Sequence, residues 1–203
     1  MSRAFSFLRP GWQKNWKIFA QESGASFGYE KARGLRKTPT IRAIYKDWII
    51  KIDAPKRGKK ATVTRVRAAY LNSDSFYFRI YREGLYQGIK KMMGMQDILI
   101  GHPAFDDAFI IQGNDERKLK ALFNNQRLRE LIHWQPDIHL KNIVDEEWKL
   151  DDEQKGLSVL EFKIMGLISN PNRLHDLYEL FAELLEQLVA IGSSHPEGPL
   201  PNS

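Results

Sequence analysis

The alternation of apolar and polar residues between Thr38 and Arg82, with a period of two, most constrains the fold. In a strand, side chains two residues apart lie on the same face, so this alternation predicts a sheet with one apolar face. We expect four strands at residues 40–45, 48–53, 62–70 and 76–82. Short connections between them predict an antiparallel meander, whose apolar face needs a cover.

A long amphipathic helix near the end of the chain can supply that cover. Apolar residues recur at helical spacing from Pro171, a favoured first helical position, to Ile191, and Gly192 provides a stop. We therefore expect this helix to lie on the sheet. Its polar face carries Asp176, Glu179, Glu183 and Glu186, and an anionic lipid surface would repel it.

Further elements complete an α+β domain. Trp12, Trp16 and Phe19 predict a helix over about 10–23, and a helical pattern covers 115–132. Strands are expected at 105–112, 138–144, 147–150 and 157–165. We predict one domain over residues 1–192, with a largely antiparallel sheet of about seven or eight strands covered by the C-terminal helix. Three prolines and a glycine predict a disordered tail over 193–203.

Charge is distributed unevenly along the chain. The formal net charge is +6, but residues 1–30 carry +2, residues 31–91 carry +13, and residues 92–203 carry −9. The predicted basic meander at 38–82 is thus followed by an acidic half at 95–192. An excess of one sign on one segment points to a partner of the opposite charge.

The basic segment contains the candidate partner-binding residues. Four of them occupy one predicted hairpin loop, and strand parity allows the other five to share one face. A cationic face with interleaved tyrosines suits an acidic protein surface, another copy of the chain, or nucleic acid as an alternative. The same arginines could instead pair with the acidic half of the chain. The candidates are Lys56, Arg57, Lys59, Lys60, Arg65, Arg67, Tyr77, Arg79 and Tyr81.

Signatures of catalysis are weak by comparison. Zero cysteines exclude disulfides, thiolate catalysis and cysteine-ligated metals, and no phosphate-binding loop, serine elbow or HExxH motif occurs. We expect no metal and no cofactor. The alternative is a small hydrolase or ligand-binding enzyme centred on His102, Asp106 and Asp107, although aspartates in a turn commonly bind its backbone.

Targeting signals are also not apparent in the sequence. The first ten residues lack the apolar core of a signal peptide, and no run of about 18 apolar residues suits a membrane span. We therefore expect a cytoplasmic protein that does not act on a membrane.

Residues 94–131, GMQDILIGHPAFDDAFIIQGNDERKLKALFNNQRLREL, resemble a group of uncharacterised bacterial proteins. That group has a G-D-x-x-FD-x-x-F-x-V strand, a polar turn, and a helix followed by R-x-x-L. His102 stands where the group usually has Asp. The resemblance, over about residues 12–190, implies one α+β domain and no catalytic residue. The matching residues are Gly101, Phe105, Asp106, Phe109, Ile111, Asp115, Leu122, Arg127 or Arg129, and Leu131.

Overall fold

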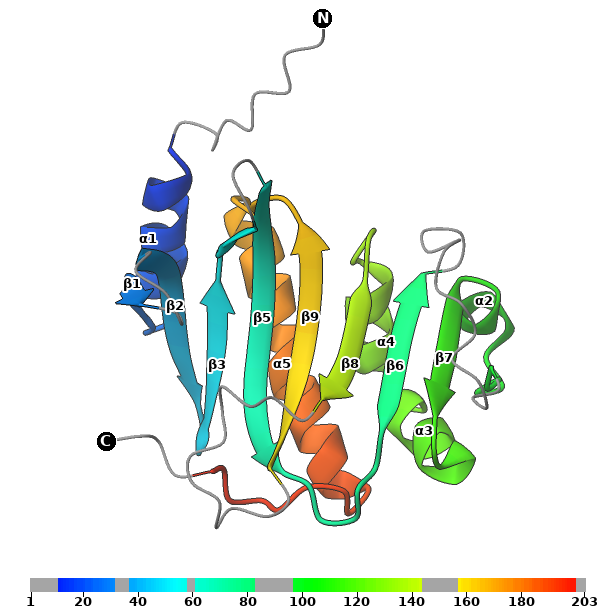
Figure 1. Ribbon diagram of the computed structural model, residues 1–203. Helices are drawn as coiled ribbons and strands as arrows, with labels where there is room; N and C mark the ends of the chain where they lie inside the picture. Colours follow the sequence, from blue (N-terminus) through cyan, green and yellow to red (C-terminus); the bar gives the residue numbers. More distant parts are fainter. Residues whose placement is uncertain (1–10, 32–36, 58–60, 83–96, 144–156, 200–203) are drawn as a thin grey trace, which may run out of the picture.

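The computed structural model describes residues 11–31, 37–57, 61–82, 97–143 and 157–199 (Figure 1). These residues form five helices and nine strands. The helices are α1 (Trp12–Glu22), α2 (Pro103–Asp106), α3 (Glu116–Phe123), α4 (Gln126–His133) and α5 (Pro171–Ala190). The strands are β1 (Ser26–Lys31), β2 (Lys37–Tyr45), β3 (Trp48–Asp53), β4 (Lys56–Arg57), β5 (Ala61–Leu71), β6 (Phe78–Arg82), β7 (Phe109–Gly113), β8 (His139–Ile143) and β9 (Leu157–Met165).

The strands form one antiparallel sheet in the order β1-β2-β3-β5-β9-β8-β6-β7, with β4 paired to β5. The α+β prediction is confirmed, but the four-stranded meander is wrong at its last strand. β2, β3 and β5 are neighbours as expected, whereas β9 and β8 lie between β5 and β6 (Figure 1). β9 pairs with β5 along its whole length, from Leu157 opposite Leu71 to Met165 opposite Val63. An alternating pattern identifies a strand but not its partner.

The helices lie on one face of the sheet, behind it in Figure 1. α5 buries its leucine stripe against the strands, as the sequence predicts, and α1 packs beside it. The fully buried Trp16 donates its indole N–H to the carbonyl oxygen of Ile168, at 2.8 Å, which ties α1 to the segment before α5. The opposite face of the sheet carries no helix among the described residues, and we call it the open face.

The predicted helix over 115–132 is divided in two. Asp115 caps α3 by accepting the backbone N–H of Lys118, and Asn125 caps α4 by accepting that of Leu128. A second cap inside the segment ends the first helix and starts another. The strand expected at 105–112 is shorter, because Pro103 begins the one-turn helix α2 instead.

The residues after α5 return along the end of the sheet. Gly192, at φ 71°, turns the chain, and Ser193 and Ser194 are buried. The carbonyl of Ser193 accepts the N–H of Ser73 at 3.1 Å. The N–H of His195 in turn bonds to the carbonyl of Leu71, so residues 193–195 contact the end of β5. The disordered tail expected over 193–203 stays a prediction. The strand expected at 147–150 lies outside the described residues.

No helix within the described ranges is both long enough and apolar enough to cross a membrane.

Candidate functional site

The structure places the basic strand residues of the sequence prediction on the open face. Val66 and Ile80 are buried under the helices, so their strand neighbours, including Arg65, Arg67 and Arg79, point the other way. Two intervening strands separate β5 from β6 and bring further basic residues to this face. Among the side chains that the structure describes, the basic ones placed on the open face by strand register are Arg42, Lys51, Arg65, Arg67, Arg79, Lys141 and Lys163.

Most of these cations follow one line across the strands. Its members are far apart in the sequence, but antiparallel register sets them side by side, about 4.8 Å from one strand to the next. The line contains Arg42, Lys51, Arg67, Glu161, Lys141, Arg79 and Gln112. The sequence prediction missed Arg42, Lys51, Lys141 and Lys163. The alternating pattern could have assigned each of these four residues to a face of its own strand, but the sequence around a strand does not show which strands lie next to it.

A buried carboxylate holds two of the arginines. Arg65 donates from Nε to Oδ1 and from Nη2 to Oδ2 of Asp53, both at 2.8 Å. Arg67, only 1% exposed, donates to Oδ2 of the same carboxylate at 3.0 Å. Such charge-assisted bonds, one pair of them bidentate, fix the direction of both guanidinium groups. Asp53 thus binds two cationic side chains of β5.

The edge of the open face repeats this arrangement. Glu30 accepts hydrogen bonds from Arg42 Nε at 2.5 Å and from Lys51 Nζ at 2.6 Å. Burial alone would raise the pKa of Glu30, but the two cationic donors outweigh it and the pKa is lowered. The carboxylate is therefore ionised at neutral pH and again compensates one of two positive charges.

Tyrosines do not form exposed platforms on this face. Tyr81 is 6% exposed, the guanidinium carbon of Arg79 lies 5.9 Å from its ring centroid, and the ring of His139 meets it edge-on at 6.4 Å. Arg79 also donates to Gln112, which in turn donates to Asp97 at 2.6 Å. Tyr77 is half-buried, before β6 begins. Stacking of a nucleic-acid base needs an exposed aromatic ring, and neither Tyr81 nor Tyr77 offers a fully exposed one.

His139 lies among the cations of β6, β8 and β9. Its strand neighbours on this face are Tyr81, which pairs with it directly, and Lys163, which follows from the register of β8 with β9. Burial lowers the pKa of His139 to about 4. The positive charges of Lys141, Arg79 and Lys163 act in the same direction. The imidazole is consequently neutral at pH 7.

Replacing His139 with glutamine should flatten the pH dependence of stability between about pH 6.5 and pH 4. In this window the unfolded imidazole, with a pKa near 6.5, binds more protons than the folded one. Stability of the natural protein therefore decreases as the pH falls through the window, and His139→Gln removes that contribution. Urea unfolding at pH 7 and pH 5 measures the difference. His195→Gln, at an exposed position, is the control and should keep the wild-type slope.

The lysine-rich loop is described only in part. Lys56 is exposed on β4, opposite Thr62 of β5, and Arg57 follows it in that strand. Lys59 and Lys60 lie outside the described residues.

Asp106 binds the backbone of the turn around His102. Asp106 accepts the backbone N–H of Ile100 on Oδ1 at 2.9 Å, and those of Gly101 and His102 on Oδ2 at 3.0 Å. Its carboxylate thus stabilises the loop that leads into α2. Asp107 is exposed at the end of that helix rather than at a strand start. These contacts leave the hydrolase alternative without support from the structure.

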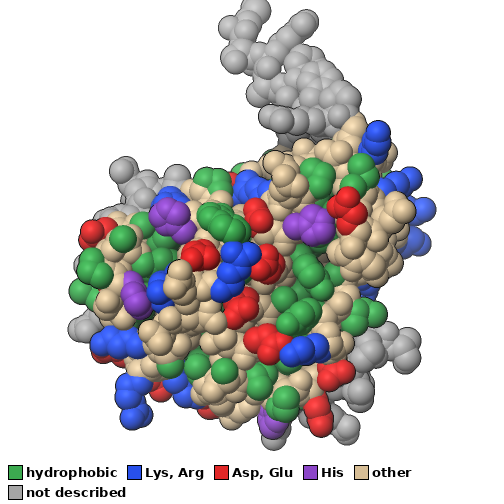
Figure 2. Space-filling model, turned by 180° about the vertical axis from the view of Figure 1, so that it is seen from behind, with side chains coloured by type: hydrophobic (Ala, Val, Ile, Leu, Met, Phe, Trp, Pro, Cys, Tyr) green, Lys and Arg blue, Asp and Glu red, His purple; other side chains and the backbone are tan. Residues whose placement is uncertain are grey.

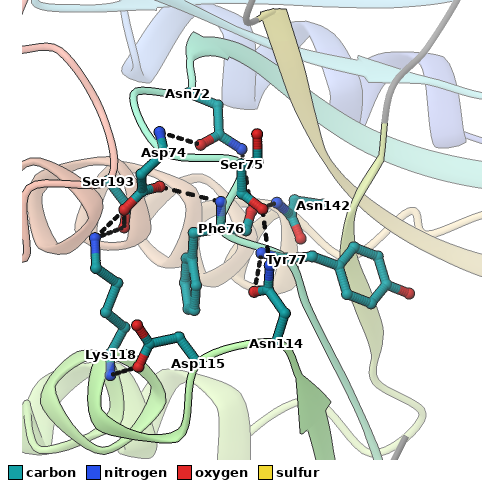
Figure 3. A network of polar contacts seen from close by, with 10 residues as sticks. All are labelled: Asn72, Asp74, Ser75, Phe76, Tyr77, Asn114, Asp115, Lys118, Asn142 and Ser193. Atoms are coloured by element: carbon teal, nitrogen blue, oxygen red, sulfur yellow. Dashed lines mark hydrogen bonds and ion pairs between the residues drawn. The ribbon is translucent and has the colours of Figure 1, made fainter. Parts of the chain in front are cut away.

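A polar network positions β6, and so Arg79 and Tyr81, beside β8 (Figure 3). Asn142 of β8 accepts the N–H of Phe78 at 2.7 Å and donates to the carbonyl of Phe76 at 2.6 Å and to the hydroxyl of Tyr70 at 3.0 Å. Outside the strands, Lys118 of α3 binds Asp74 and Ser193. The network anchors the segment that crosses from β5 to β6 over the ends of β9 and β8.

Fold and site together define an α+β protein with helices on one face of an antiparallel sheet and a basic open face. No protein-family model matches the chain, and no curated protein does. The structure is similar to the crystal structure of the mycobacterial trehalose monomycolate transport factor A, TtfA, with a TM-score of 0.54. The alignment spans 96% of this chain and 100% of that one at 11% identity, so the likeness is one of fold. The resemblance of residues 94–131 to uncharacterised bacterial proteins stays a prediction.

Proposed function

We propose that this protein is a non-enzymatic binding module whose open face receives an acidic protein partner. One observation carries the proposal. The described strands bring seven basic side chains to the open face against three carboxylates, Glu30, Asp53 and Glu161. On these strands positive charges outnumber negative ones, and such an excess attracts and orients an anionic partner.

The ion pairs of the open face favour a preformed surface over a flexible one. Arg65 and Arg67 are held by Asp53, and Arg42 and Lys51 by Glu30. Lys141, whose ammonium lies 3.9 Å from Glu161, is about one third exposed. A fixed pattern of positive charge gives specificity as well as faster association.

The aromatic residues favour a protein partner over nucleic acid. Binding of single strands gains much of its energy from bases stacked on exposed rings, and Tyr81 is buried. The protein of similar fold, TtfA, is a transport factor, which supports an interaction role rather than catalysis. On the helical face, acidic and basic side chains are interspersed (Figure 2).

Binding of a fluorescein-labelled polyglutamate peptide of about 20 residues tests the proposal. We expect measurable affinity at about 50 mM salt and a steep loss at about 300 mM, because salt screens such contacts over roughly one Debye length. Lys141→Glu together with Lys163→Glu should weaken binding at least tenfold. The matched control, Lys14→Glu with Lys17→Glu, makes the same change in net charge at exposed positions of α1. It should bind much better than the open-face variant.

Three outcomes contradict the proposal. The first is that polyglutamate does not bind at low salt. The second is that both double variants lose the same affinity for polyglutamate. The third is that the protein binds a single-stranded DNA of equal charge more tightly than polyglutamate. A mass that rises with protein concentration and collapses at high salt would instead identify the acidic partner as a second copy of the chain.

A further inference from the structure

An apolar row crosses the open face next to the line of cations. Ile44 of β2 pairs with Ile49 of β3, and Val159 of β9 pairs with both Ala69 of β5 and Ile143 of β8. The register of β3 with β5 places Ile49 beside Ala69, so the row is continuous. Its inner members, Ala69, Val159 and Ile143, belong to an apolar cluster on the face opposite the main core.

The row is covered at its centre and open at its edge. Val159 is fully buried, Ile49 is half-buried, and Ile44 is 73% exposed. A single exposed isoleucine is ordinary on a protein surface, but one that continues a buried apolar row can act as the entry of a contact surface. The outer part of the row, at Ile44 and Ile49, is therefore where a partner can add apolar contact.

The cations nearest to this edge are Arg42 and Lys51. Each lies two residues from an isoleucine of the apolar row on the same strand, and therefore about 6.8 Å away on the same face. The side chain of Arg42 is 46% exposed and that of Lys51 is 15% exposed, and Glu30 compensates only one of the two charges. Charged and apolar rows thus run side by side across β2 and β3.

We propose that an acidic amphipathic helix of the partner lies across β2 and β3, with apolar side chains on Ile44 and Ile49 and carboxylates at Arg42 and Lys51. This inference rests on the proposed function and names the kind of segment that would be bound. Residues three or four apart on a helix face are about 5–6 Å from each other, close to the 4.7–4.9 Å between strands. A helix with adjacent acidic and apolar stripes therefore matches both rows.

Two synthetic peptides of equal composition test the inference. One places leucine and glutamate in adjacent stripes along a helix of about 21 residues, and the other has the same residues in scrambled order. We expect the amphipathic peptide to bind at least tenfold more tightly at about 50 mM salt. Ile44→Ser should remove most of that preference. Met165→Ser also replaces an exposed apolar residue, but one at the end of β9 rather than in the apolar row. It should leave the preference for the amphipathic peptide unchanged.

Equal binding of the two peptides, or no effect of Ile44→Ser, overturns the helix inference. If the polyglutamate assay still shows salt-dependent binding that needs Lys141 and Lys163, the proposed function survives that failure. If neither peptide nor polyglutamate binds at low salt, both fail. Vesicles containing phosphatidylglycerol provide a further arm: binding to them that depends on Ile44, without preference between the peptides, overturns the inference in favour of a lipid surface.

Discussion

Replacing Asp53 with alanine should lower the free energy of unfolding by about 3–5 kcal/mol, the loss expected when one partner of a buried ion pair is removed. Asp53 is 2% exposed and accepts three hydrogen bonds from two arginines. The guanidinium of Arg67 is buried and cannot turn to water when the carboxylate is lost. Urea unfolding followed by circular dichroism measures the change.

Asp107→Ala is the matched control for this prediction. Asp107 is an exposed aspartate at the end of α2, so its replacement should change the free energy of unfolding by no more than about 0.5 kcal/mol. A loss below about 1 kcal/mol in Asp53→Ala would mean that the two arginines find other compensation. The open face would then be less rigid than the ion pairs indicate, and a preformed binding surface would lose its support.

Replacing Asn142 with leucine should lower the free energy of unfolding by about 2–4 kcal/mol, because buried polar groups lose their hydrogen bonds without access to water. Leucine has the same number and branching of side-chain heavy atoms, so the substitution removes polar contacts without opening a cavity. The N–H of Phe78, the carbonyl of Phe76 and the hydroxyl of Tyr70 are the groups that lose a partner. The midpoint of urea unfolding should fall, with little change in its slope.

Asn172→Ala should be nearly neutral, since Asn172 is exposed on the first turn of α5. An Asn142→Leu protein as stable as the wild type would contradict the role given to the network of Figure 3. It would then be the backbone pairing of β6 with β8 and β7 that holds the crossing segment. An intermediate result can be resolved with Asn142→Ala, which adds a cavity to the polar loss.

The two stability predictions bear on function because both sites position the open face. Asp53 directs Arg65 and Arg67, and Asn142 keeps β6 beside β8, which sets Arg79 next to Lys141. A charged surface can bind selectively only when its charges have defined positions. Weakening either site should therefore reduce affinity for an acidic partner beyond the effect of one lost charge.

Local elements were predictable where a pattern repeats over several turns or residues. The leucine stripe of α5, the tryptophans of α1 and the alternation in β2, β3, β5 and β9 each identify one element. The division between α3 and α4 was not predicted, because the apolar spacing continues across Asn125 and an asparagine alone is a weak signal that a new helix begins. β1 was not predicted either, since Ser26–Lys31 has few apolar residues and pairs at an edge.

The sequence predicted that the candidate site is basic and which of its residues share a face of the sheet, but it did not predict the full set of residues on that face. Parity correctly placed Arg65, Arg67, Arg79 and Tyr81 on one face, and it could not show that β9 and β8 lie between their strands. The sequence also could not predict how deeply each arginine is buried: Arg67, expected on a partner-binding face, is only 1% exposed. The difference arises because burial depends on neighbours that are distant along the chain.

By itself, the sequence determined the types of the main elements, the need for a helix over one sheet face, and the division of charge between basic and acidic segments. Periodicity and charge are local properties, so they can be read along the chain. Only the tertiary structure decided which strands pair, because backbone hydrogen bonds are alike for every strand and pairing depends on how side chains pack across the whole sheet. That pairing inserts β9 and β8 between β5 and β6, and it thereby adds Lys141, His139 and Lys163 to the basic face.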